Sequence, residues 1–350
     1  MDDHAALIAA VVDRPDDDTP RLVLADFLDD HGDPDRAAFV RAQVELARTP
    51  EWEPFAVECR HRRPEWSDAG GPFRAALPAF PEGWSVGWAE PPFRRGLGWR
   101  VWLASVLTWE EVAPELFRAA PVGAVHLRAA ATLDDWHRFA AGPWLERIRE
   151  VHLEAGSPVE PVRALAAGGR LTGLAGLHFG IATSPGLAVL LADVLDGPLA
   201  ANLRDLTFRL GSPATIDDLM DVLRDHAGRF DRLGLRVMMG LGGDQVRRWA
   251  AAGGLRGLSA LDLTSSSGLR NDGTRALAEA LAGGAWAGHT LVLTGVGMNE
   301  DGAKALAGSP GLATVRLLDL GGNRLRQPAA VRALAASPHL AGLRALRLPR

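Results

Sequence analysis

Three histidines occupy equivalent places in three short apolar segments: Val125-His126-Leu127, Val151-His152-Leu153 and Leu177-His178-Phe179. Each histidine follows the previous one by 26 residues. If the three segments are neighbouring strands of one sheet, their side chains lie about 4.8 Å apart on one face. Such a row can gather one zinc ion, which takes nitrogen ligands at about 2.0–2.1 Å. It can equally form a polar ladder that meets the surface of a partner.

Both uses of the histidine row remain open from the residues alone. Glu150 or Glu154 could orient an imidazole, as carboxylates behind metal ligands do. A histidine contact would make partner binding sensitive to pH, because the ordinary pKa of the side chain is about 6.5. We expect the partner contact and assign no metal ligand, no catalytic residue and no cofactor. A metal-binding protein or metal-dependent hydrolase that uses the histidine row is the alternative. No H-E-x-x-H, P-loop or C-x-x-C motif supports such chemistry elsewhere in the sequence.

The row requires a repeated strand, and the sequence contains one. The clearest copy is Val315 to Leu325, with the pattern V-x-x-L-x-L-x-x-N-x-L. Leu318 and Leu320 share one face of a short strand, because side chains alternate. Asn323 is expected to bond backbone groups of the following loop. In other copies Ser266 and Val296 stand at the asparagine position.

The second apolar residue of this pair recurs ten times, at intervals of 24 to 30 residues, and a helical pattern follows most copies. These landmark residues are Leu103, Leu127, Leu153, Phe179, Phe208, Leu235, Leu263, Leu293, Leu320 and Leu348. One strand-helix unit cannot bury its own apolar face, so repeats of this length stack into a solenoid. The sequence therefore predicts an α/β solenoid of about ten strand-helix units over residues 93–350.

The repeat length and the strand-then-helix order resemble leucine-rich repeat proteins of the ribonuclease-inhibitor-like type. The resemblance implies a horseshoe with a parallel sheet on its concave side and helices outside. It also implies binding of a protein partner on the concave face, as an adaptor or recognition subunit rather than an enzyme. The residue between the two apolar positions points into that face, and the partner contacts expected there are Trp102, His126, His152, His178, Asp262 and Asp319.

Residues 1–48 form a separate all-α domain in this interpretation. Arg21 to Asp33 and Arg36 to Gln43 resemble the small repeat-companion domain that precedes repeats in many bacterial proteins. Four of its charged residues, Arg21, Asp26, Asp33 and Arg41, are expected either to fix two helices or to form a docking surface. Thr19 is expected to cap the second helix and Asp33 the third.

Residues 49–92 are a connector rich in tryptophan and proline, in which Trp66, Trp84 and Trp88 are interspersed. We expect it to cover the first repeat, because solenoid ends need such caps; an aromatic interaction surface is the other interpretation. At the opposite end the sequence stops two residues after the tenth landmark. An open strand edge invites pairing, so self-association or a partner is expected there.

Composition limits the remaining classes of function. The net charge is −5, and the candidate arginines of the repeats are interrupted by acids, which disfavours nucleic acid. No apolar run approaches the length of a membrane helix, and no basic, apolar leader is visible. Cys59 is the single cysteine, so no internal disulfide is expected and a cytoplasmic location fits.

Overall fold

The computed structural model describes residues 3–61, 71–80, 86–128, 131–154, 159–182, 186–210, 216–237, 240–325 and 327–349. The chain forms two compact units. The N-terminal unit comprises Met1–Glu154 and Ala167–Gly173, and the C-terminal unit comprises Ala155–Ala166 and Leu174–Arg350. Trp66 and Trp84, expected to help cover the first repeat, lie outside the described residues.

The N-terminal unit begins with four helices: α1 (Asp3–Asp13), α2 (Thr19–Asp30), α3 (Pro34–Arg48) and α4 (Pro54–His61). Gly32 ends α2 with φ +84°, the left-handed conformation that glycine adopts without strain. The predicted cap of α3 is confirmed, because the Asp33 carboxylate accepts a hydrogen bond from the Arg36 N–H. The predicted cap of α2 is wrong. Thr19 is already the first residue of that helix, and the Asp17 carboxylate accepts its N–H at 2.9 Å.

A hairpin from beyond residue 92 completes the core of these helices. Its strands are β2 (Phe93–Arg94) and β3 (Leu97–Gly98). Leu97 is buried with Val11, Leu24, Leu28 and Val40 from the first three helices.

The tip of this hairpin approaches α3 so closely that only glycine fits there. Both turn residues have positive φ, 52° at Arg95 and 81° at Gly96. A β-carbon on Gly96 would lie only 2.7 Å from the Val40 α-carbon. Glycine therefore serves both the turn and the close packing.

The first repeats follow in the same unit and form a sheet ordered β1-β4-β5-β6. Its strands are β1 (Val86–Trp88), β4 (Arg100–Leu103), β5 (Ala124–Leu127) and β6 (Glu150–Leu153). β4, β5 and β6 are parallel, whereas β1 runs antiparallel along the outer edge of β4. The connector thus supplies a strand at the edge where a cap was expected. The helical elements of these repeats are η3 (Val106–Thr108), α5 (Trp109–Ala119), α6 (Leu133–Ala141) and η4 (Pro143–Arg147).

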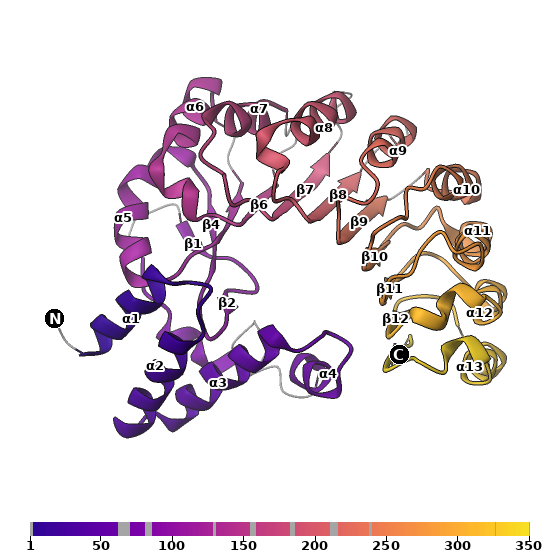
Figure 1. Ribbon diagram of the computed structural model, residues 1–350, viewed down its shortest axis with the longest axis horizontal. Coiled ribbons are helices and arrows are strands. Elements are labelled where there is room, and N and C mark those ends of the chain that lie inside the picture. Colours follow the sequence, from indigo (N-terminus) through magenta and orange to yellow (C-terminus); the bar gives the residue numbers. More distant parts are fainter. Residues whose placement is uncertain are drawn as a thin grey trace. The chain divides into compact units, whose positions relative to one another are not determined.

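The C-terminal unit continues the strand-helix alternation with seven described parallel strands in chain order. These are β7 (Gly176–Ala182), β8 (Asp205–Leu210), β9 (Arg232–Val237), β10 (Ala260–Asp262), β11 (Thr290–Val292), β12 (Leu317–Asp319) and β13 (Ala345–Arg347). Within this unit α8 (Leu187–Asp196), α9 (Ile216–Asp225), α10 (Gly243–Ala251), α11 (Arg270–Ala282), α12 (Glu300–Ala307) and α13 (Pro328–Ala335) all lie on one side of the sheet (Figure 1). α7 (Val159–Gly168) spans the division between the units.

The landmark residues line up as the repeat predicts. Leu103, Leu127 and Leu153 pair in register, and so do Phe179, Phe208 and Leu235. All landmarks from Leu103 to Leu320 are buried, each at most 3% exposed. The predicted fold class, an α/β solenoid of strand-helix repeats, is confirmed. Only the last landmark, Leu348, is partly exposed.

Asn323 confirms the predicted role of the repeat asparagine. Its Oδ1 accepts the N–H groups of Val296 and Met298 at 3.1 and 3.2 Å, and its Nδ2 donates to the carbonyls of Leu293 and Leu320 at 2.6 and 3.0 Å. All of these bonds except the one to Leu320 reach back to the preceding repeat. Buried backbone groups with no strand partner are thereby satisfied.

Ser266 performs the same task with a shorter side chain. It accepts the Val237 N–H at 3.0 Å and donates to the Leu235 carbonyl at 2.7 Å. The hydroxyl reaches fewer groups than an amide does, but it still joins two repeats. This explains how the array tolerates a serine at the asparagine position of this repeat.

Candidate functional site

The outward face of the N-terminal sheet carries one aromatic and two imidazole side chains in a single row. Trp102 pairs in register with His126, and His126 with His152. The residues on either side of them in each strand are buried, which leaves the middle residue on the opposite face. All three side chains are half-buried. The register predicted for this part of the row is therefore present.

The row is tightly packed. The rings of His126 and His152 stack at 3.9 Å between centroids, with their planes inclined by 26°. The Trp102 indole lies over Gly87 of β1, where a β-carbon would stand 2.7 Å from the indole Nε1. The Arg128 guanidinium lies 5.5 Å above the Trp102 ring, a cation–π arrangement.

Two glutamates flank the row, and each contacts both an arginine and a histidine. Glu150 accepts a hydrogen bond from Arg100 at 2.9 Å and lies 3.8 Å from the Nε2 of His152. Glu154 lies 2.8 Å from the Nε of Arg128 and 3.6 Å from the Nδ1 of His126. The acids and bases of this face therefore compensate one another.

These contacts determine the charge of the row at neutral pH. Burial alone would raise the pKa of Glu150, but the contact with His152 and the charge of Arg100 outweigh it and hold the pKa below its usual 4.5. Burial lowers the pKa of His152 below its usual 6.5, against the opposing effect of Glu150. Glu150 is consequently ionised at pH 7, and the His152 ring is neutral.

The stacked histidines do not form a chelating pair in this arrangement. Metal ligation uses a nitrogen lone pair in the plane of each ring, and the zinc lies at about 2.0–2.1 Å from both nitrogens. Rings stacked with nearly parallel planes direct those lone pairs side by side rather than to one point. Zinc binding by this pair requires one ring to rotate. The third histidine, His178, lies on β7 of the C-terminal unit, in register with Thr207.

The two aspartates of the predicted row belong to the C-terminal unit and have local partners. Asp262 accepts the N–H of Thr264 at 2.8 Å, and its second oxygen lies 3.5 Å from Arg236. Asp319 accepts the N–H of Gly321 at 2.9 Å and the guanidinium of Arg347 at 3.0 Å. Both carboxylates therefore close the turn that follows their strand.

The four charged residues singled out in the helical domain do not form one network. Arg41 of α3 binds Asp26 of α2 at 2.7 Å, together with Asp29, and so links two helices, as one of the two alternatives expected. Asp33 instead caps α3. Arg21 is 1% exposed and donates to the Asp17 carbonyl at 3.0 Å. Burial, aided by the nearby charge of Arg95, lowers the pKa of Arg21 to about 10, and the side chain stays protonated at neutral pH.

Two arginines that contact residues of these sites could not be predicted from the repeat pattern. Arg94 of β2 lies 3.8 Å from Glu150 and adds positive charge to the row. Arg95, at the tip of the same hairpin, donates to the Asp16 carbonyl at 2.8 Å and lies 3.5 Å from Asp18. Both precede the first repeat strand, where the periodicity that identified the other positions has not yet begun.

Comparisons with known proteins add little to this geometry. No protein-family model matches the chain, and no curated protein matches it either. One solved structure to which the chain is similar is the crystal structure of a Rad7 and Elc1 complex in yeast, with 14% identity and a TM-score of 0.40. The match covers 66% of this chain and 64% of that chain, which is just under two thirds of its length. The fold assignment rests on the strand register and burial described above. Among the described residues, no helix has both the length and the apolar character needed to cross a membrane.

Proposed function

We propose that the protein is a non-catalytic binding module that binds a protein partner on the concave face of its repeat sheet, the face that points away from the helices. The observation that carries the proposal is the in-register row of Trp102, His126 and His152, packed and flanked by compensated charges. These three side chains are the first contacts we assign. His178, Asp262 and Asp319 are the contacts assigned to the C-terminal unit, where Asp319 acts through the Arg347 side chain that it binds.

The chemistry of the row suits a protein surface. Tryptophan and arginine are enriched among the residues that dominate protein interfaces, and Trp102 with Arg128 supplies one such pair. A neutral imidazole costs less to dehydrate than a charged one. Side chains already held by neighbours lose little further freedom when a partner binds.

Mixed charge favours a protein over nucleic acid as the partner. Glu150 and Glu154 lie among Arg94, Arg100 and Arg128 on the same face. A phosphate backbone placed there would meet both carboxylates. A folded protein can present cations and anions in matching positions, which is how such surfaces select partners.

The family and the setting form part of the same proposal. The N-terminal helices serve as a repeat-companion domain of a bacterial, ribonuclease-inhibitor-like repeat protein that acts as an adaptor in the cytoplasm. The resemblance in residues 21–43 and the single cysteine support this. The proposal also includes self-association through β13, where Leu346 is 38% exposed. Sedimentation of the wild type and a Leu346→Asp variant tests this last part, which predicts a loss of dimer in the variant.

Affinity capture from lysate of the source organism tests the main proposal. Wild-type protein is compared with a Trp102→Ala/His152→Ala variant and with a matched control, Glu110→Ala/Arg118→Ala, on the exposed face of α5. We expect a partner that the wild type and the control retain and the row variant loses. Binding of that partner, once purified, should weaken at least about tenfold in the row variant, as for a residue central to an interface. A partner list unchanged by the row variant would exclude this part of the sheet.

Metal analysis separates the alternative function from the proposed one. Protein purified without an affinity tag is assayed for zinc, together with His152→Ala and His178→Ala variants. Stoichiometric zinc that both variants lose would support a metal-binding protein. Partner capture that persists after chelation supports the binding module.

A further inference from the structure

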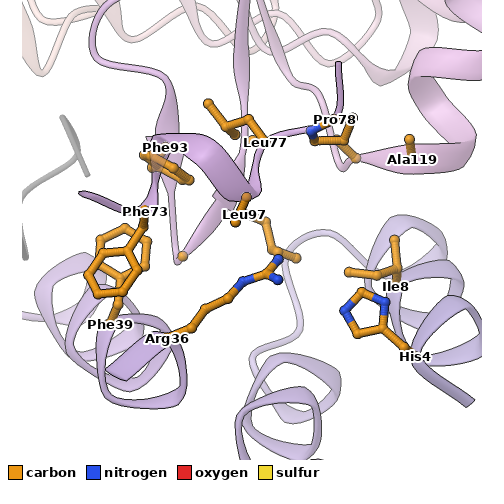
Figure 2. A pocket seen from close by; sticks show the side chains of 14 residues that line it. His4, Ile8, Arg36, Phe39, Phe73, Leu77, Pro78, Phe93, Leu97 and Ala119 are labelled. Atoms are coloured by element: carbon orange, nitrogen blue, oxygen red, sulfur yellow. The ribbon is translucent and has the colours of Figure 1, made fainter. Parts of the chain in front are cut away.

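A pocket of about 90 Å³ in the N-terminal unit is lined mainly by apolar side chains, with Arg36 and His4 as its basic groups. It lies between α1, α3, the hairpin β2–β3, the end of α5 and the segment that follows η2 (Gly71–Ala76). The aromatic and aliphatic lining includes Phe39, Phe73, Leu77, Phe93 and Leu97 (Figure 2). Phe39 stacks on Phe73 at 4.6 Å and meets the edge of Phe93 at 5.0 Å, so the aromatic wall is well packed.

Arg36 enters this pocket from α3, and Figure 2 shows its guanidinium group directed between Leu97 and the side chains of His4 and Ile8 on α1. Burial lowers the pKa of Arg36, and the nearby charge of Asp33 offsets only part of that effect. The Asp33 carboxylate is itself engaged at the start of α3, where it accepts the Arg36 backbone N–H at 3.3 Å. Arg36 is half-buried, so its guanidinium has lost part of its contact with water to the apolar side chains around it.

The other arginines of α3 show that this placement is not a general property of the helix. Arg41 binds Asp26 and Asp29, and Arg48 binds Asp18 at 2.7 Å. Among the residues that the structure describes, no carboxylate forms an ion pair with Arg36. Removing a charge from water without a partner is costly, and a guanidinium presents a planar fork that fits a carboxylate through two parallel hydrogen bonds.

We propose that this pocket binds a small monocarboxylate with an apolar body, its carboxylate on the Arg36 guanidinium and its apolar part against Phe73, Phe93 and Leu77. Arg36, the permanent cation of the pocket, matches a single negative charge. A phosphate carries more charge and needs more donors than one guanidinium, and the aromatic walls offer it none. The site uses residues other than the Trp102–His126–His152 row and stands whether or not that row binds a protein.

Calorimetric titration of the full chain with benzoate and hexanoate tests the site, with benzamide and inorganic phosphate as comparison ligands. We expect the carboxylates to bind, and benzamide and phosphate to bind at least about tenfold more weakly. The Arg36→Gln variant should bind the carboxylates at least about tenfold more weakly than the wild type, because it loses the hydrogen bonds between two charged groups. Arg41→Gln is the matched control, since it removes the same charge from the same helix outside the pocket. It should retain wild-type affinity.

Four results would overturn the proposal, three of them from the titrations above. The first is that no carboxylate binds at a ligand concentration of about 10 mM, because a Kd weaker than the millimolar range does not indicate a specific site. The second is that the wild type binds benzoate and benzamide equally. The third is that Arg36→Gln binds benzoate as well as the wild type does. The comparison of benzoate with benzamide needs no variant, so it decides the question even if Arg36→Gln does not fold. A peptide ending in phenylalanine that binds much more tightly than benzoate would also overturn it, since the natural ligand would then be a protein C-terminus.

Discussion

The outward faces of β4–β6 and of β10–β12 use the same repeat in different ways. In the N-terminal unit the polar side chains of the face contact one another, as Glu150 does with Arg100 and His152. In the C-terminal unit the acids contact backbone, as Asp262 does with the Thr264 N–H. The first arrangement leaves indole and imidazole surfaces available to another molecule, whereas the second uses its polar groups to close turns.

Strand length explains the difference. β4, β5 and β6 each have four residues, and the outward residue is followed by one more residue of the strand. β10 and β12 have three residues, and the outward aspartate is the last of them. An aspartate at a strand end can reach the N–H two residues further on, which is the usual Asx geometry. A residue inside the strand cannot, so it packs against the neighbouring strands.

Substitutions at Leu318 and Leu346 should show the largest contrast within the C-terminal unit. The two leucines pair in register on β12 and β13, but Leu318 is fully buried and Leu346 is 38% exposed. Leu318→Ala should lower the free energy of unfolding by about 2–5 kcal/mol, because it removes buried methyl groups and leaves a cavity. Leu346→Ala should cost less than about 1 kcal/mol, since surface changes have small effects. Urea denaturation measures both, and equal losses would contradict the burial difference.

Asn323 and Ser266 provide a graded test of the bonds between repeats. Asn323→Ala leaves the buried N–H groups of Val296 and Met298 and two carbonyls without their hydrogen-bond partner. It should lower the free energy of unfolding by about 2–4 kcal/mol. Ser266→Ala leaves one N–H and one carbonyl without their hydrogen-bond partner and should lower the free energy of unfolding by about 1–2 kcal/mol. Urea denaturation measures the two losses from the shifts in midpoint, provided that the dependence of the unfolding free energy on urea is the same in both variants. A larger loss for Ser266→Ala would mean that the amide is not the stronger of the two links.

Periodicity made the repeat array predictable, and its absence marks where prediction stopped. The ten landmarks could be placed because each is one of a pair of apolar residues repeated along the chain. The register of Trp102, His126 and His152 followed from the same spacing. Sequence could not show that the two rings stack, nor that Arg94 approaches Glu150 from the hairpin, because these contacts join segments with no shared pattern. Arg21 was expected in a network with surface acids or on a docking surface. It is instead buried, bound to the Asp17 carbonyl and close to the charge of Arg95 in the hairpin.

The smallest expected effect is a loss of folding stability in mild acid. It arises from a histidine in the row of the N-terminal sheet. His152 has a lowered pKa in the folded protein. Between that pKa and 6.5 the unfolded chain takes up a proton that the folded chain does not, so stability falls as the pH decreases through this range. Glu150, whose pKa is also lowered, causes a further loss below pH 4.5 by the same reasoning. The His152 contribution should therefore be visible before the carboxylates titrate.

Urea midpoints at pH 7.5 and pH 5.5 isolate that contribution. The wild type should lose more stability between the two values than His152→Gln does, by about 1.4 kcal/mol at most, because one pH unit below 6.5 corresponds to that free energy for one proton. His137→Gln, a change at an exposed histidine of α6, is the control and should lose as much as the wild type. If His152→Gln also loses as much as the wild type, burial does not hold this ring neutral. The row would then become charged in mild acid, and its chemistry would approach that of the charged turns in β10–β12.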